Sequence, residues 1–476
     1  MNTAFTTVIG VPATVNDIVI QTDGRILIGG DFRGVNESFR DGVARLNADG
    51  STDTTFNPGI GTGGFAAVLA LAVQTDGKIL VGGNFSSFGG GMSNAGIARL
   101  NPDGSLDAMF NASVSGGVNA IAIQPDGRII VGGTFNFVNG VFNNNYIARL
   151  NTDGTTDMAF NSGTGFNSTV EDVVFLTGGQ ILVGGSFNEY DGAMGVSGIA
   201  RLNSNGTRDT GFTTNTGTGF DNTVYELAVQ TDGRIVVGGF FGNFNGSSVP
   251  GIARLNSNGT IDNTFNVGTG FSNYVNDLAV QPDGRILCIG FFTTYTGIPR
   301  LHLLRLNTDG TLDASFDSGA DFSTTLNAVA LQPDGRILIG GFLSLYDNTP
   351  RFGIARILAG DTINWTGAMN NDWHNATNWL PNFVPTTVDN AVIGDNFTVN
   401  ITSANAGVLT VTVGTNTTLT VASSRSLTIE GGTNNGTIAG AGTLNFTGGS
   451  LGNNGTISVS SVNAQSSGGF NKSLSG

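Results

Sequence analysis

Two short motifs alternate along the first three quarters of the chain, and their spacing constrains the fold more than any other feature. The first motif is QTDGRILIGG at Gln21, with further copies beginning at Gln74, Gln124, Gln230, Gln281 and Gln332 and a weaker one at Leu176. Its turn glycines run from Gly24 to Gly335, so six intervals cover 311 residues, about 52 each. Seven copies of one unit therefore extend to about residue 360.

The second motif lies between the copies of the first. It reads ARLNADGSTDTTF from Ala44 and recurs from Ala98, Ala148, Ala200, Ala253 and Leu304. In both motifs an x-Asp-Gly or x-Asn-Gly loop joins apolar, β-branched runs, which is typical of a hairpin with a type I turn closed by a left-handed glycine. Four short strands per unit, without helical periodicity, predict the four-stranded blades of an all-β, seven-bladed β-propeller.

These motifs resemble the delta-60 repeat family of bacterial β-propellers, whose units carry a QPDGKILVGG core followed by ARLNPDGSLDxxF. The resemblance covers about three quarters of the chain. It implies a propeller fold and an extracellular setting, and it implies no particular reaction.

The sequence changes character after Gly360, which predicts a propeller over residues 1–360 and a second domain over residues 361–476. All three tryptophans, Trp365, Trp373 and Trp379, lie in NWTGAMNNDWHNATNW at its start. This segment resembles the NWTG module that precedes solenoid repeats in surface proteins of Bacteroidota. NNGTI recurs at Asn434 and Asn453, a period of 19 residues that suits one coil of a β-solenoid. Only two coils are readable, so we expect either a longer natural protein or an end held by another chain.

Composition excludes several classes of function. A net charge of -15 opposes binding to nucleic acid and to anionic membranes, and the longest apolar stretch, at residues 66–73, is too short to cross a bilayer. The single cysteine, Cys288, rules out an internal disulfide and is expected to be inert core. The first residues lack the features of a secretory signal. The predicted location, secreted or cell surface, therefore rests on the resemblance to the delta-60 family. Either the chain was trimmed or it is exported by another route.

No catalytic constellation is evident, and we predict a non-enzymatic protein without cofactors. The two histidines, His302 and His374, fall in different predicted domains, and the few glutamates occupy non-equivalent positions in the repeats. The Asn47, Asp49, Ser51 and Asp53 pattern resembles a calcium loop, but Asn205 and Asn258 replace the central Asp in two units, as a turn tolerates. The predicted function is binding, adhesion or assembly at the cell surface. The alternatives are a carbohydrate-active propeller enzyme and a subunit of an extracellular filament or surface layer.

The candidate ligand-binding residues come from arginines that the repeats do not explain. Arg40, Arg300 and Arg351 each stand five residues before the arginine of the second motif, in units one, six and seven. If the ring closes, these units are neighbours, which predicts an arc of three arginines for an anionic glycan or an acidic protein surface. The full predicted site is Arg33, Phe39, Arg40, Arg300, His302, Arg351 and Phe352. The simpler alternative is local neutralisation by Asp41, Glu37 and Asp347.

Two further predictions concern the fold. Each arginine of the second motif should pair across its hairpin with the aspartate eight residues later, as Arg45 with Asp53. The N-terminal NTAF segment, which matches DTTF at residues 53–56, should complete blade seven. The competing hypothesis is that residues 362–365 complete it.

Overall fold

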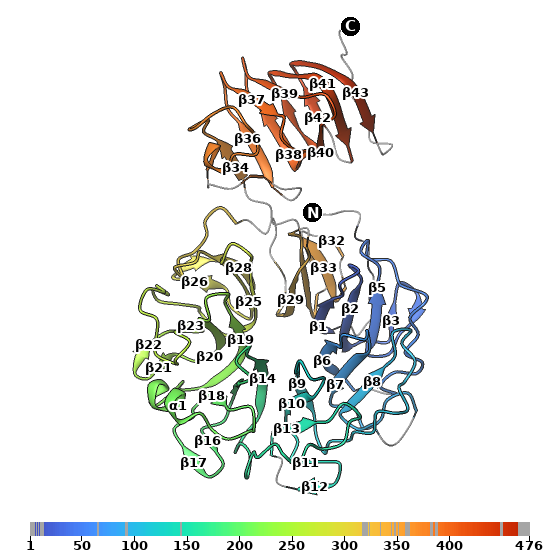
Figure 1. Cartoon of the computed structure of the whole chain (residues 1–476), viewed down its shortest axis with the longest axis vertical. Coiled ribbons are helices and arrows are strands. Elements are labelled where there is room, and N and C mark those ends of the chain that lie inside the picture. Colours follow the sequence, from blue (N-terminus) through green and yellow to red (C-terminus); the bar gives the residue numbers. More distant parts are fainter. Residues whose placement is uncertain are drawn as a thin grey trace. The chain divides into compact units, whose positions relative to one another are not determined.

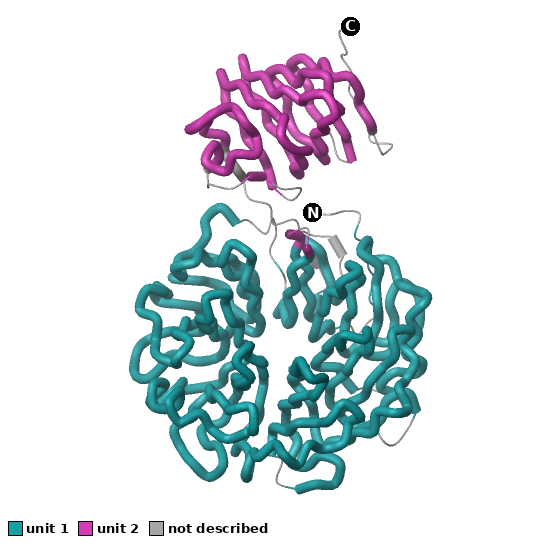
Figure 2. The backbone as a smooth tube through the Cα atoms, in the orientation of Figure 1, with its two compact units in different colours: residues 1–332, 337–357 teal, residues 333–336, 358–476 magenta. Residues whose placement is uncertain are grey.

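The computed structural model describes residues 14–63, 66–90, 94–142, 145–316, 324–333, 335–343, 345–346, 349–350, 352–357, 362–380, 384–385, 389–447 and 451–464, with the single positions 5, 7, 9 and 322. The chain divides into two compact units (Figure 2). The first comprises residues 1–332 and 337–357, and the second comprises residues 333–336 and 358–476.

The first unit is the predicted seven-bladed propeller. Each repeat forms an antiparallel three-stranded sheet, and the first strand of every sheet lies nearest the centre of the ring (Figure 1). In chain order the blades are β1 (Thr14–Ile20), β2 (Ile26–Asp31), β5 (Val43–Leu46); β6 (Val68–Val73), β7 (Ile79–Gly83), β8 (Ile97–Leu100); β9 (Val118–Ile123), β10 (Ile129–Gly133), β13 (Ile147–Leu150); β14 (Val170–Phe175), β15 (Ile181–Gly185), β18 (Ile199–Leu202); β19 (Thr223–Val229), β20 (Ile235–Phe240), β23 (Ile252–Leu255); β24 (Val275–Val280), β25 (Ile286–Gly290), β28 (Leu303–Leu306); and β29 (Leu326–Leu331), β30 (Ile337–Gly341), β33 (Ile354–Ile357).

The fourth strand of each blade is shorter than predicted. In blades one to six, where the structure describes it, it makes one antiparallel bridge to the third strand, as Thr52 does with Leu46. The loop between the second and third strands instead carries a small hairpin in six blades: β3 (Gly34–Val35) with β4 (Ser38–Phe39), β11 (Phe137–Val138) with β12 (Val141–Phe142), β16 (Glu189–Tyr190) with β17 (Ala193–Met194), β21 (Asn243–Phe244) with β22 (Ser247–Ser248), β26 (Thr294–Tyr295) with β27 (Ile298–Pro299), and β31 (Leu345–Tyr346) with β32 (Thr349–Pro350).

The predicted turn chemistry is confirmed. Gly24 and Gly50 adopt φ values of 83° and 89°, which only glycine adopts without strain. Asp49 accepts hydrogen bonds from the backbone N–H of Ser51 (2.9 Å) and from its hydroxyl (2.6 Å). Asn205 accepts the same two bonds from Thr207, so Asn can replace Asp here. The side-chain oxygens considered for calcium therefore already bond within the turn.

The core consists of the second strands and the aromatic rings that follow them. β2, β7, β10, β15, β25 and β30 are buried almost throughout, which confirms that such strands are apolar on both faces. The phenylalanines after the glycine pair are at most 5% exposed: Phe32, Phe85, Phe135, Phe187, Phe241 and Phe292. Cys288 is completely buried among them, and burial raises the pKa of its thiol.

The predicted arginine–aspartate pairs form in all six motifs, and all are buried except Arg201–Asp209, which is partly buried. The Arg Nε to Asp Oδ2 distances are 2.7 to 2.9 Å for Arg45–Asp53, Arg99–Asp107, Arg149–Asp157, Arg201–Asp209, Arg254–Asp262 and Arg305–Asp313. Each guanidinium also lies over the phenylalanine three residues after its aspartate, as Arg254 does over Phe265 at 4.7 Å.

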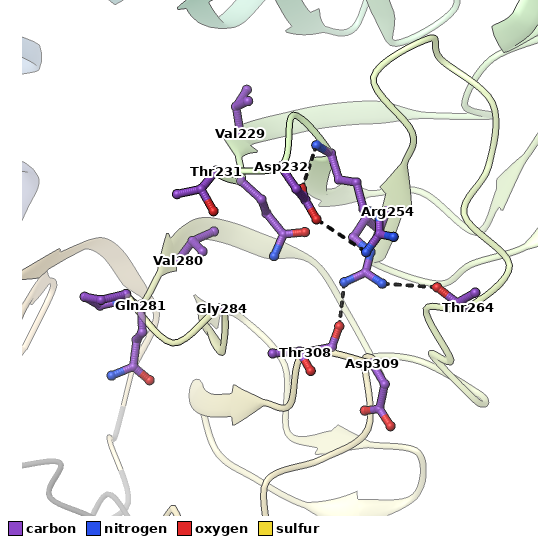
Figure 3. A pocket seen from close by; sticks show the side chains of 13 residues that line it. Val229, Thr231, Asp232, Arg254, Thr264, Val280, Gln281, Gly284, Thr308 and Asp309 are labelled. Atoms are coloured by element: carbon purple, nitrogen blue, oxygen red, sulfur yellow. Dashed lines mark hydrogen bonds and ion pairs between the residues drawn. The ribbon is translucent and has the colours of Figure 1, made fainter. Parts of the chain in front are cut away.

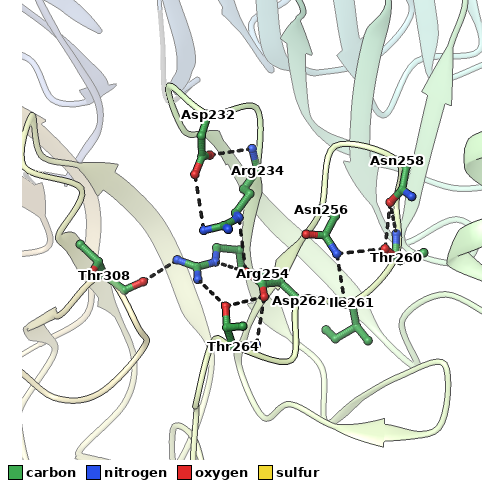
Figure 4. A network of polar contacts seen from close by, with 10 residues as sticks. All are labelled: Asp232, Arg234, Arg254, Asn256, Asn258, Thr260, Ile261, Asp262, Thr264 and Thr308. Carbon is green, nitrogen blue, oxygen red and sulfur yellow. Dashed lines mark hydrogen bonds and ion pairs between the residues drawn. The ribbon is translucent and has the colours of Figure 1, made fainter.

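The same arginines join one blade to the next. Arg45 Nη1 donates to the carbonyl of Pro102 in the turn of blade two (2.6 Å), and Arg254 donates to Thr308 of blade six (Figure 4). The equivalent bonds of Arg99, Arg149 and Arg201 reach Thr152, Ser204 and Ser257. One side chain per blade thus fixes a hairpin and a blade interface.

Phe5 lies against blade seven, as the predicted closure of the ring by the N-terminal segment requires, while residues 2–4 lie outside the described residues. Arg356 of blade seven donates to the carbonyl of Ala48 in blade one, and its guanidinium lies 4.6 Å from the centre of the Phe5 ring. Phe5 thus takes the place that Phe265 has under Arg254. The competing hypothesis is wrong, because β34 (Thr362–Trp365) pairs with β35 (Trp379–Leu380) and β36 (Asn390–Ile393) of the second unit.

Phe5→Ala should lower the free energy of unfolding of the propeller by about 2 kcal/mol. Phe5 is only 2% exposed, but a terminal segment can detach locally, which keeps the loss below that of a central phenylalanine. Urea unfolding followed by circular dichroism measures this difference. Phe142→Ala, at a ring that is 72% exposed, is the control, and equal effects of the two substitutions would contradict the closure.

One element in the repeats differs from the prediction. Helix α1 (Thr210–Thr216) follows the second motif of blade four, where only turns were expected. Asp209 caps the helix by accepting a hydrogen bond from the N–H of Phe212 (3.1 Å).

The second unit is a parallel β-solenoid of about four turns, more than the two coils readable in the sequence. Its remaining strands are β37 (Thr398–Ile401), β38 (Ala406–Val413), β39 (Thr418–Val421), β40 (Ser426–Asn434), β41 (Thr437–Phe446), β42 (Leu451–Asn453) and β43 (Thr456–Ala464). Asn434 pairs in register with Asn453, as the 19-residue period predicts. An earlier coil is longer, since Asn390 pairs with Thr410, 20 residues later. The 19-residue period therefore does not extend to that coil.

The three tryptophans form part of the solenoid core. Trp365 and Trp373 each pack edge-to-face on Trp379, with ring centres 4.8 Å apart. Asn378, in the 3-10 turn η1 (Ala376–Asn378), is fully buried, and its side-chain oxygen accepts bonds from the N–H groups of Met369 and Asn370. The NWTG-like segment therefore has a structural explanation.

Candidate binding face of the propeller

The predicted site residues lie in the loops between the second and third strands of three blades. Arg33, Phe39 and Arg40 belong to blade one, Arg300 and His302 to blade six, and Phe352 to blade seven. Arg351 lies outside the described residues. Blade one contacts blade seven through the Asn327 to Asn16 side-chain bond (3.1 Å), and blade six contacts blade seven through Asp277 and Val329. The three loops therefore belong to consecutive blades, while the arc itself remains a prediction.

Arg40 and Arg300 have equivalent surroundings. Nη1 of each donates to the carbonyl of the preceding residue, Phe39 at 2.7 Å and Pro299 at 2.9 Å. Within the described part of the chain, neither arginine forms an ion pair with a carboxylate. Asp41, proposed to neutralise Arg40, is buried, and its carboxylate accepts a bond from the Thr62 hydroxyl (3.3 Å).

His302 occupies an unusual backbone position next to Arg300. Its φ of 63° falls at a slot where five other blades have glycine, namely Gly42, Gly96, Gly198, Gly251 and Gly353. The ring is 7% exposed, with Nδ1 3.0 Å from the carbonyl oxygen of Gly290. It stacks on Phe291 at 5.8 Å between ring centres. Blade three has Tyr146 in the same slot with a φ of 67°, so the slot accepts a ring in two of the seven blades.

The contact with His302 identifies an aromatic feature that the sequence reasoning missed. Phe291 is 45% exposed and immediately follows the glycine of the first motif. Phe240 and Phe342 hold the same position in blades five and seven, whereas blades one to four have Asp31, Asn84, Thr134 and Ser186. The signal was present in the sequence, since these aromatics occur in a subset of the repeats, unlike the buried ring that follows them.

A second missed set is a ring of carboxyls on the innermost strands. Asp17, Asp172, Glu226 and Asp277 share one slot, which blades two, three and seven fill with alanine. Three of them link blades: Asp17 accepts the N–H of Leu71 (2.6 Å), Asp172 that of Leu227 (3.0 Å) and Asp277 that of Val329 (2.7 Å).

Burial raises the pKa of each of these carboxyls. The pKa of Asp17 rises to about 6, that of Asp172 to about 7 and that of Asp277 to about 8, although backbone N–H donors oppose the change. Burial and then repulsion from Asp172 and Asp277 raise the pKa of Glu226. Part of this set is therefore protonated near neutral pH.

The opposite end of the blades carries a groove whose lining arginines already bond to neighbouring residues. Figure 3 shows this groove of about 530 Å³, lined by the turns of blades five and six and by Arg254. The Arg254 guanidinium bonds to Asp262, Thr264 and Thr308, and Arg234 lies 3.4 Å from Asp232. Its charged groups are thus used in holding the turns together. The described residues contain no cluster of three or more His, Cys, Asp or Glu side chains that could hold a metal ion.

Comparison with solved structures yields propellers of low similarity. The WD40 β-propeller domain of Doa1 is 15% identical, with 74% of this chain and 95% of that one covered and a TM-score of 0.45. The extracellular domain of the putative one-component system BT4673 from B. thetaiotaomicron is 16% identical, with 75% and 40% covered and a TM-score of 0.46. PorZ, a bacterial surface component of the type-IX secretion system of Porphyromonas gingivalis, is 16% identical, with 68% and 45% covered and a TM-score of 0.41.

At this level of similarity, the solved structures bear on neither ligand nor activity. The chain spans about 40% of the length of the BT4673 domain. Comparison with curated proteins gave no significant match. None of the described helices is long and apolar enough to cross a membrane.

Family comparison is more informative, because it follows the repeats themselves. The domain of unknown function DUF8693 matches residues 364–469, which form most of the second unit. The family described as "Domain of unknown function (DUF5122) beta-propeller" matches seven segments: 21–56, 74–110, 124–160, 179–212, 230–265, 281–316 and 332–364. Each segment contains the second and third strands of one blade, and together they make up about half of the sequence, so the chain belongs to the DUF5122 β-propeller family.

Proposed function

We propose that this protein is a non-enzymatic binding protein of the bacterial exterior, and that its propeller recognises an anionic glycan. The observation that carries the proposal is the pair Arg40 and Arg300. These arginines occupy equivalent positions in blades one and six, on either side of blade seven, and lack ion pairs among the described residues. Arg351 holds the same position in blade seven.

Arginine suits this role because its planar guanidinium binds carboxylates and sulfates through paired donors. The negative charge of the whole protein sets this cluster of arginines apart from the rest of the surface. With a net charge of -15, the protein repels polyanions in general, so any affinity for one must come from a local concentration of positive charge. An extracellular setting follows from the resemblance to delta-60 repeats and to the NWTG surface module, which we also propose for this chain.

The rival function is a carbohydrate-active enzyme, and the inner-strand carboxyls are the observation that favours it. Their raised pKa values resemble those of general acids. However, Asp17, Asp172 and Asp277 each accept a backbone N–H from the adjacent blade, which explains them as links between blades. Release of reducing ends from an anionic glycan by the wild-type protein would support the enzyme instead.

Replacing Arg40, Arg300 and Arg351 together with alanine should weaken heparin binding by about a hundredfold or more. Charge-assisted hydrogen bonds contribute about 1.5 to 3 kcal/mol each, so the loss of two such bonds is enough to weaken binding about a hundredfold. Binding is measured by calorimetry at low ionic strength. Arg208→Ala is the matched control, because Arg208 is an additional arginine of blade four, away from the arc. Unchanged heparin binding by the triple variant would refute the site, and preference for polyaspartate over heparin would indicate an acidic protein partner.

A further inference from the structure

Three adjacent blades expose a phenylalanine at one position where the other four have a polar residue. Phe240, Phe291 and Phe342 are 48%, 45% and 54% exposed, in blades five, six and seven. Exposure of these rings has no packing explanation, since the next residue in each blade, such as Phe241 or Phe292, already fills the core. Exposed aromatic groups on consecutive elements commonly mark a binding surface.

Neighbouring tyrosines join two of these rings, Phe240 and Phe291, into a continuous surface, which we call the aromatic strip (Tyr225, Phe240, Tyr274 and Phe291). Tyr274 is its centre: its ring lies 5.9 Å from Phe240, 5.7 Å from Phe291 and 5.7 Å from Tyr225. The contacts with Phe240 and Tyr225 are edge-to-face, whereas Phe291 stacks on Tyr274 at 29°. Phe291 also stacks on His302, which holds it in place. The strip therefore presents fixed, partly exposed aromatic rings across the boundary between blades five and six.

Polar groups line a groove at the Phe240 end of the strip. The groove, of about 290 Å³, is bounded by Phe240 and by the polar residues Asp221, Asn222, Ser272 and Asn273. Burial alone would raise the pKa of Asp221, but hydrogen bonds from Asn243 and Gly242 outweigh it and lower the pKa. The groove thus combines an aromatic wall with a carboxylate, amides and a hydroxyl.

We propose that the aromatic strip and this groove bind a neutral carbohydrate chain. A sugar ring has an apolar C–H face that packs on the negative face of an aromatic ring, and a rim of hydroxyls that needs donors and acceptors. The side-chain oxygens of Asn222 and Asn273 already accept the N–H groups of Thr223 and Tyr274, but a lipid or apolar peptide would bury their NH2 groups without acceptors, at a cost in free energy. An anionic ligand would meet the ionised Asp221. The strip contacts the predicted arginine site through His302 but shares no residue with Arg40 and Arg300, and its ligand differs in charge, so substitutions of the arginines and of the phenylalanines test the two sites separately.

The test uses the full chain and neutral hexasaccharides of β-linked glucose, xylose, mannose and N-acetylglucosamine, with calorimetry as the readout. Phe240 and Phe291 are replaced together by serine, the residue that blade four has at this position as Ser186. Loss of two stacking faces should weaken binding on the order of tenfold or more. Phe142→Ser removes a ring that is 72% exposed and lies outside the strip, and it should leave affinity unchanged.

Separate arms identify the source of any effect. The circular dichroism spectrum and melting temperature of the double variant show whether it folds, and the single variants Phe240→Ser and Phe291→Ser replace it if it does not. Arg40→Ala with Arg300→Ala should leave affinity for the neutral sugar intact. Absence of binding to all four oligosaccharides, or equal affinity of the wild-type and aromatic variants, would overturn the proposal.

Discussion

Replacing Arg254 with alanine should lower the free energy of unfolding of the propeller by about 3 to 5 kcal/mol. The Arg254 side chain is 3% exposed and that of Asp262 5%, so the substitution leaves a buried carboxylate without its main partner. It also removes the bond to Thr308 of the next blade and the contact with Phe265 (Figure 4). Burial therefore makes these pairs far more important for stability than exposed ion pairs.

A matched control for this prediction lies on the same carboxylate. Arg234 approaches Asp262 Oδ2 at 3.6 Å but is 41% exposed, so Arg234→Ala should cost less than about 1 kcal/mol. All three tryptophans belong to the second unit, so their fluorescence monitors that unit, while circular dichroism follows both. Equal losses for the two arginines would show that burial does not govern these pairs.

The propeller should lose stability as pH rises from 5 to 8.5. The pKa values of Asp17, Asp172 and Asp277 are about 6, 7 and 8 in the folded protein, above those of an unfolded chain. The folded state therefore binds more protons than the unfolded state in this window, and the free energy of unfolding falls as these protons are released. Melting temperatures measured between pH 4.5 and 8.5 test this slope.

Asp277→Asn should flatten the slope near pH 8, since asparagine can still accept the N–H of Val329 but does not ionise. A variant that keeps the wild-type slope would show that Asp277 does not titrate in this range.

Below pH 4 the stability of the propeller depends on a different group of aspartates, whose pKa values are lowered. Burial of Asp53 is outweighed by bonds from Thr55 and Arg45, which lower its pKa to about 2, so its stabilising contribution is lost as pH falls toward that value.

The features predicted correctly from the sequence are those that recur in every unit. An eight-residue spacing across a three-residue turn determines which Arg and Asp face each other, and a motif fragment at Phe5 predicts ring closure. The second bond of each arginine, to the turn of the next blade, depends on how blades pack, which no single repeat contains.

The candidate site was harder to predict, because it consists of departures from the repeat. Arg40 and Arg300 were found by subtracting the arginines that the motif explains. Phe240 and Phe291 were missed because a buried phenylalanine follows each, which makes the exposed ring look like part of the core. Asp17 and its equivalents were missed because the pairing of β1 with β2 shifts register between Val15 and Asp17, so simple alternation does not describe their strand.

The bond from Arg356 to Ala48 joins the last blade to the first, and this closure should make the propeller unfold differently from the solenoid. A linear stack of coils can fray from its last coil inward, because a terminal coil has a single neighbour. A closed ring has no terminal member: every blade is held from both sides, and opening one joint exposes two hydrophobic surfaces at once. We therefore expect amide hydrogen exchange in the propeller to occur through concerted opening, whereas the coils of the solenoid exchange in graded order.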